Sequence, residues 1–169
     1  MESIALFTTA LQYEEKIRDL YHTAAASVDD PRGKAIFLSL ADDEQSHIDF
    51  LHYSINQLQS SAPIELERLA SQLPDQALIE KNIDKLQAMI PEKMLGDIKT
   101  VLNSALQMEK ETSAFYRDAC ARSTGEIKKI FERFLVIEDR HVDLVQIELD
   151  HAMQNGVWFN FMEINLEAE

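Results

Sequence analysis

The sequence predicts an all-α protein, a four-helix bundle with a long crossover between its second and third helices. Four long stretches carry apolar side chains at the 3.6-residue period of an amphipathic helix. The 169 residues include four Gly and four Pro against a hydrophobic fraction of 46%, a composition that favours helical globular structure. The two halves of the chain also resemble each other. We therefore expect a single domain, residues 1–169, built from two duplicated helical hairpins.

The four long helices are expected over residues 3–28, 31–60, 97–122 and 126–154. The second helix begins at Pro31, because proline is favoured in the first turn of a helix. The fourth helix ends at Asn155 and Gly156, which form a typical C-terminal stop. A short turn before residue 126 joins the third and fourth helices, so these two should pack as a hairpin like the first two.

The segment over residues 61–96 does not continue the long helical pattern. Three prolines interrupt two short amphipathic pieces, residues 64–71 and 76–89, and Met89 is expected to fill space in the core. A bundle helix of ~25 residues is ~37 Å long. The segment is long enough to bring the chain back along that length, which predicts a crossover between two hairpins.

Two Glu-x-x-His pairs stand out on the buried faces of these helices. Glu44 and His47 lie within the apolar stripe of the second helix, and Glu138 and His141 within that of the fourth. Residues three apart share one face of a helix, and an unpaired buried carboxylate costs several kcal/mol. One such pair is more often a structural ion pair than a metal site. Two pairs in matched settings favour metal ligands.

The duplication extends this pattern to six polar residues and two tyrosines. The matched pairs are Glu14 with Glu109, Tyr21 with Tyr116, Glu44 with Glu138, and His47 with His141. Within each hairpin the two Glu residues lie at equal distances from the turn and therefore face each other. Docking the hairpins brings four Glu and two His to mid-bundle, where two divalent cations would cancel the four negative charges.

These residues resemble the ligand set of the ferritin-like diiron-carboxylate superfamily, and its rubrerythrin branch in particular. That pattern is one Glu from each of two helices and Glu-x-x-His from each of the other two, and the resemblance covers residues 3–154. It implies a ferritin-like bundle with two iron ions bridged by Glu44 and Glu138, with Mn or Zn as substitutes. The terminal ligands would be Glu14, His47, Glu109 and His141. Tyr21 and Tyr116 would be catalytic tyrosines that hydrogen-bond the ligand carboxylates; packing as ordinary core tyrosines is the alternative.

The sequence departs from the rubrerythrin pattern at two points. Rubrerythrins proper add a rubredoxin domain with four Cys, whereas this sequence has only Cys120. Many also carry an extra Glu one turn after the third-helix ligand, where this chain has Thr112. Because one cysteine cannot hold a rubredoxin iron, an enzyme that reduces hydrogen peroxide or dioxygen is expected to use an external electron donor, rubredoxin-like or a flavoprotein. Ferritin-like iron oxidation and storage, or a metal-stapled structural module without turnover, remain as alternatives.

The remaining features of the sequence indicate which partners the chain can have and where it is located. A net charge of −14 argues against binding to nucleic acid or an anionic membrane. The start of the sequence has no basic region typical of a signal peptide, which favours the cytoplasm. The aromatic tail, residues 157–162, should pack on the bundle or on a second subunit, and a homodimer or larger assembly is expected. Glu148 is interpreted as a hydrated residue at the bundle end.

Overall fold

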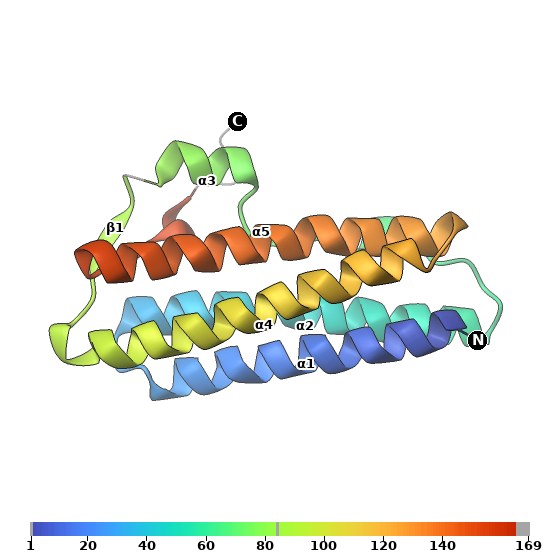
Figure 1. Ribbon diagram of the computed structural model, residues 1–169, viewed down its shortest axis with the longest axis horizontal. Helices are drawn as coiled ribbons and strands as arrows, with labels where there is room; N and C mark the ends of the chain where they lie inside the picture. Colours follow the sequence, from blue (N-terminus) through green and yellow to red (C-terminus); the bar gives the residue numbers. More distant parts are fainter. Residues whose placement is uncertain (1, 84, 165–169) are drawn as a thin grey trace.

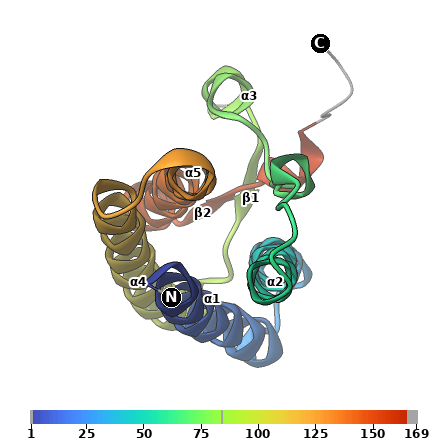
Figure 2. The same cartoon turned by 90° about the vertical axis from the view of Figure 1, so that its right-hand side faces the viewer.

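The protein is described by a computed structural model that covers residues 2–83 and 85–164. Four long helices run side by side (Figure 1): α1 (Glu2–Ser27), α2 (Pro31–Gln59), α4 (Leu95–Ala121) and α5 (Gly125–Asn155). Helices α1 and α2 pack closely along their length, as do α4 and α5, and the two hairpins meet through α1 and α4 (Figure 2). The predicted all-α bundle is confirmed.

The ends of the long helices follow from local signals. Asp30 is the N-cap of α2 and its carboxylate accepts a hydrogen bond from the Gly33 amide, while Pro31 occupies the first helical position. Helix α5 ends at Asn155 and is capped by Gly156, whose left-handed backbone (φ 64°) lets its amide donate a hydrogen bond back to the carbonyl of Ala152. Among the described residues, no helix is long and apolar enough to cross a membrane.

The connection between α2 and α4 carries short elements: η1 (Leu66–Arg68), α3 (Gln76–Asn82), β1 (Gln87–Met89) and η2 (Glu92–Met94). It starts where α2 ends and reaches the opposite end of the bundle, where α4 begins (Figure 1). The helical piece expected to run to residue 89 stops at Asn82, and β1 follows. Met89 is 80% exposed, so its assignment to the core was wrong: exposure alternates along β1, and Met89 lies on the outer side.

The aromatic tail packs against α2 and α5. It contains β2 (Val157–Phe159) and η3 (Phe161–Glu163), and β2 pairs antiparallel with β1. Trp158 is fully buried, packs edge-on against Phe37, and donates a 2.7 Å hydrogen bond from its indole nitrogen to Asp30. The tail therefore packs on its own bundle and gives no support to an interface with a second subunit.

The apolar core lies in two parts, one on each side of a polar layer. One part includes Tyr21, Phe37 and Trp158, and the other includes Phe7 and Phe131. On each long helix, the side chains of the polar layer fall between residues of the first part and residues of the second. This layer contains the six residues singled out by the repeat.

Candidate metal centre

The four long helices bring the six predicted ligands together in the polar layer. Each side chain is fully buried. Four ligand atoms that lie within 4.8 Å of one another come from Glu14, Glu44, His47 and Glu138, and a second such set comes from Glu44, Glu109, Glu138 and His141. Glu44 and Glu138 belong to both sets. Two adjacent metal sites that share these two carboxylates would have this arrangement.

Both imidazoles direct Nδ1 toward the carboxylates. His141 Nδ1 lies 2.7 Å from Glu44 Oε1 and 3.4 Å from Glu109 Oε1. His47 Nδ1 lies 3.5 Å from Glu44 Oε2, 3.5 Å from Glu138 Oε1 and 3.7 Å from Glu14 Oε2. Each imidazole can therefore offer Nδ1 to a metal ion that it shares with the carboxylates.

Most of these ligand atoms lack a hydrogen-bond partner. The atoms without a hydrogen bond include both oxygens of Glu44 and Glu138, one oxygen each of Glu14 and Glu109, both ring nitrogens of His47, and Nδ1 of His141. Of these, Glu44 Oε1 and His141 Nδ1 form a close ion-pair contact. Leaving one buried polar group unpaired costs about 1–3 kcal/mol, and more if it is charged, so such a concentration calls for a counter-ion. Carboxylate oxygens together with imidazole nitrogens suit iron or manganese. The donor set therefore fits divalent cations.

The electrostatics of the cluster also reflect a concentration of buried acids. Burial, reinforced by repulsion from Glu14, raises the pKa values of Glu44 and Glu138. Burial opposes the charged form of His47 and His141, but the surrounding carboxylates outweigh it and raise both pKa values. Without cations, the cluster thus holds protons that a bound metal ion must displace.

Two buried tyrosines contact the outer carboxylates across the hairpins. Tyr21 donates a 2.7 Å hydrogen bond to Glu109 Oε1, and Tyr116 donates one of 2.8 Å to Glu14 Oε1. Burial and the adjacent carboxylate raise the pKa of each tyrosine well above its ordinary value. Both hydroxyls therefore stay protonated and remain donors. The other oxygen of each bonded carboxylate is left free.

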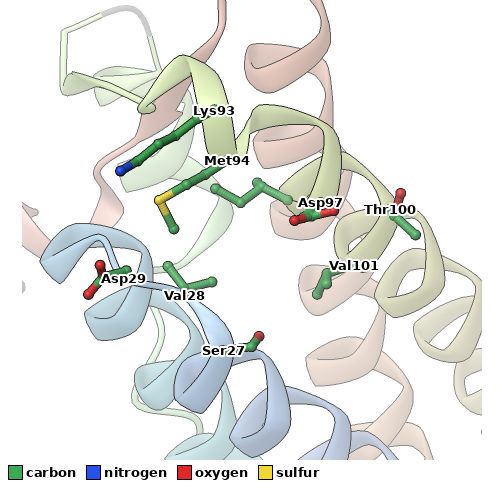
Figure 3. Close-up of a pocket in the computed structure, with 9 residues that line it drawn as sticks. Ser27, Val28, Asp29, Lys93, Met94, Asp97, Thr100 and Val101 are labelled. Atoms are coloured by element: carbon green, nitrogen blue, oxygen red, sulfur yellow. The ribbon is translucent and has the colours of Figure 1, made fainter.

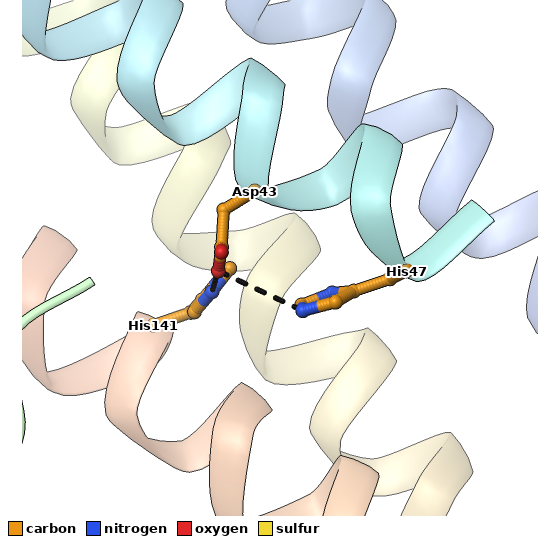
Figure 4. A group of neighbouring side chains, drawn as sticks. All are labelled: Asp43, His47 and His141. Atoms are coloured by element: carbon orange, nitrogen blue, oxygen red, sulfur yellow. Dashed lines mark hydrogen bonds and ion pairs between the residues drawn. The ribbon is translucent and has the colours of Figure 1, made fainter. Parts of the chain in front are cut away.

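Asp43 belongs to the same layer and was missed in the sequence. It is fully buried, and Figure 4 shows it beside the two imidazoles: its Oδ2 lies 2.7 Å from His141 Nε2 and 3.6 Å from His47 Nε2. Its counterpart in the repeat is Ile137, so a comparison of the two halves could not find it. The available signal was its spacing of four residues from His47, which puts both on one face of α2.

Glu148 was interpreted incorrectly. It is 1% exposed rather than hydrated, and neither of its carboxylate oxygens has a hydrogen-bond partner. Burial raises its pKa well above the ordinary value, although the nearby backbone of Phe159 opposes the shift. The folded tail therefore approaches Glu148, and no local sequence pattern indicates that the tail would reach this residue. Glu148 does not belong to either ligand set.

A separate pocket of about 550 Å³ lies at the end of the bundle, between the α1–α2 turn and the start of α4. Figure 3 shows its lining, which includes Val28, Met94 and Val101 together with Asp29 and Lys93. The pocket contains none of the six residues of the carboxylate–histidine cluster, which are Glu14, Glu44, His47, Glu109, Glu138 and His141. It is therefore distinct from the candidate metal centre.

The comparison with known families identifies the fold. The rubrerythrin family model matches residues 6–149, which cover most of the chain, including all six cluster residues and both tyrosines. No curated protein and no solved structure matches the chain significantly. Together with the ferritin-like bundle and the buried carboxylate–histidine cluster, the family match shows that the chain belongs to the rubrerythrin family.

Proposed function

We propose that this protein holds two iron ions in the carboxylate–histidine cluster and reduces hydrogen peroxide or dioxygen there. The observation that carries the proposal is the pair of four-ligand sets that share Glu44 and Glu138. Membership of the rubrerythrin family supports iron as the metal. Glu14 and His47 would complete one site, and the matching residues Glu109 and His141 would complete the other.

The chain prepares this centre in two ways. The fully buried side chains exclude bulk water from the cluster. Tyr21 and Tyr116 hold the outer carboxylates through their hydrogen bonds, so the free oxygens keep a fixed direction. When bound, two ferrous ions would supply the two electrons that cleave an O–O bond and would become ferric. Reduction of one hydrogen peroxide also consumes two protons and yields two waters.

Turnover requires that two electrons return to the centre. The sequence contains one cysteine, Cys120, and a rubredoxin-type iron needs four. We propose that a separate carrier, rubredoxin-like or a flavoprotein, supplies these electrons. Protein with its full iron content should therefore react with one equivalent of oxidant and then stop until such a donor is added.

Anaerobic iron loading followed by stopped-flow mixing tests the proposal. We expect about two ferrous ions per chain, with faster oxidation by hydrogen peroxide than by dioxygen. Glu44→Gln should lose iron and oxidation, whereas Glu111→Gln, an exposed change on α4, should keep both. Comparable or faster oxidation by dioxygen would contradict the peroxide preference. Growth of a large iron mineral would indicate storage, and bound iron inert to both oxidants would indicate a structural role.

A further inference from the structure

We propose that Asp43 is a positioning residue for the imidazole of His141 and, at longer range, for that of His47, and that it connects the metal centre to the crossover segment at residues 71 and 72. The inference rests on the proposed metal site and adds a residue outside its ligand set. Asp43 is fully buried and comes from α2, beside Glu44, but it lies on the far side of the imidazole rings from the carboxylate cluster.

The orientation of the imidazoles gives Asp43 its role. His141 directs Nδ1 to the cluster carboxylates and Nε2 to Asp43 Oδ2, at 2.7 Å. His47 has the same orientation, with Nε2 at 3.6 Å from the same oxygen. An imidazole whose one nitrogen donates a proton to a carboxylate presents the lone pair of the other to a metal. Asp43 therefore selects the tautomer of His141 in which Nδ1 can bind a metal, whereas Nε2 of His47 faces the same carboxylate without a hydrogen bond.

The crossover segment fixes Asp43 in turn. The Ser71 hydroxyl donates a 2.8 Å hydrogen bond to Oδ2, and the Gln72 amide donates one of 2.7 Å to Oδ1. With the imidazole of His141, three donors converge on one carboxylate. Oδ2 already accepts from two of them, Ser71 and His141, so the carboxylate acts as an acceptor for the His141 imidazole, and we do not assign it to a third metal ion.

Asp43 supports the imidazoles of the two metal sites unequally. The repeat places Ile137 where a second carboxylate would complete the symmetry, so a single carboxylate faces both imidazoles. The Nε2 atom of His141 is at hydrogen-bond distance from Oδ2, whereas that of His47 is 3.6 Å away. A stronger bond to the outer nitrogen raises the basicity of the inner one. We therefore expect the site that contains His141 to bind its metal more tightly.

Asp43→Asn tests this role with cobalt as the metal. An amide group would turn one of two acceptor positions into a donor that faces another donor. We expect a 10–100-fold loss of cobalt affinity, of the size found for other outer carboxylates. In wild-type protein, proton NMR should show two paramagnetically shifted, exchangeable N–H signals from the imidazoles. In the variant these signals should shift and exchange with water faster.

Two further variants complete the design. Asp49→Asn changes an exposed aspartate of the same helix and should leave affinity and N–H signals unchanged. Ser71→Ala removes one donor to Asp43 without touching the ligands, and should weaken cobalt binding in the same direction by a smaller factor. This second variant also tests the inference if Asp43→Asn does not fold.

The outcomes separate the inference from the proposed function. Wild-type affinity and unchanged N–H exchange in both Asp43→Asn and Ser71→Ala would overturn the role of Asp43 while the metal site stands. A third cobalt per chain that is lost in Asp43→Asn would also overturn it, because Asp43 would then be a ligand. Wild-type protein that binds no divalent metal would overturn the metal site and this inference together.

Discussion

The hydroxyl of Tyr21 in α1 donates a 2.7 Å hydrogen bond to Oε1 of Glu109 in α4. The bond joins the two hairpins at the level of the carboxylate–histidine cluster, between two groups that are fully buried. Tyr116 makes the equivalent bond to Glu14 in the opposite direction. The centre is thus fixed by a reciprocal pair of contacts that follow the duplication of the sequence.

Tyr21→Phe should lower the stability of the metal-free protein. After loading, the variant should still bind as much iron as the wild type. The change leaves Glu109 Oε1 buried without its donor, and a hydrogen bond to a charged group contributes about 1.5–3 kcal/mol. Urea unfolding should show a loss of that size in the free energy of unfolding. Tyr116→Phe is the matched variant and should have a similar effect. Loss of both irons in either variant, even at saturating ferrous iron, would contradict a role outside the ligand set.

Gly33→Ala should destabilise the protein, against the usual preference of helices for alanine. A Cβ at this position would lie 2.6 Å from Trp158 Cζ2 and 2.9 Å from Val28 Cγ1. Overpacking of this kind costs about 1–3 kcal/mol, and thermal unfolding should detect it. Gly96→Ala is the control, because a Cβ there meets nothing within 4 Å, and it should not lower stability.

Trp158→Leu separates the clash from other effects of the Gly33 change. If the indole ring causes the loss, alanine at position 33 should cost less in the Trp158→Leu protein than in the wild type. The coupling energy from this double-mutant cycle should be about 0.5–3 kcal/mol. The structure places Trp158 of the tail against the start of α2. If the losses of the two changes are simply additive, this contact does not cause the loss at position 33.

Much of the fold was predictable because the helical signals are long and repeated. Each long helix carries a sustained apolar stripe, and its observed ends lie within two residues of those expected. The β1–β2 ribbon was missed because strands of three residues show no clear periodicity, and their pairing depends on the folded tail. Glu148 was misjudged for a related reason: the tail backbone near it comes from Phe159, and no local pattern indicates that approach.

The six residues that meet in the buried cluster could be picked out from the sequence because each has a counterpart in the other half of the duplication. A Glu or His on an apolar stripe is ambiguous alone, but Glu44 with His47 and Glu138 with His141 reinforce each other. Asp43 lacks this support, since Ile137 replaces it in the second hairpin. Its contacts with Ser71, Gln72 and His141 arise only when the crossover packs on α2. The symmetric part of the centre was thus accessible from sequence, and the asymmetric part required the structure.

Removal of metal should lower the melting temperature markedly. A ligand that binds only the folded state stabilises it by about 2.7 kcal/mol at 100 times its dissociation constant. Iron-loaded or cobalt-loaded protein should therefore melt at a higher temperature than protein treated with a chelator. The difference should shrink in Glu44→Gln, which removes a carboxylate shared by both sites. Equal melting curves with and without bound metal in the wild type would contradict stabilisation by the centre.

Glu148→Gln should change how stability depends on pH. Burial raises the folded-state pKa of Glu148 well above its ordinary value, whereas the unfolded chain should titrate near pH 4.3. Between these two pKa values the folded state keeps a proton that the unfolded state releases, so wild-type stability falls as pH rises. Glutamine does not titrate. The stability of the variant relative to wild type should therefore rise with pH, by up to about 1.4 kcal/mol per unit.

Urea unfolding of the metal-free proteins between pH 5 and 8 would measure this difference. The cluster residues titrate in both proteins, so their contribution cancels when the two free energies of unfolding are subtracted. Glu111→Gln, an exposed change, should give a difference from wild type that is flat over the same range. Glutamine at position 148 also lies in a buried site, which shifts the whole curve but not its slope. A flat difference for Glu148→Gln would show that its carboxyl ionises in the folded protein as it does in the unfolded chain.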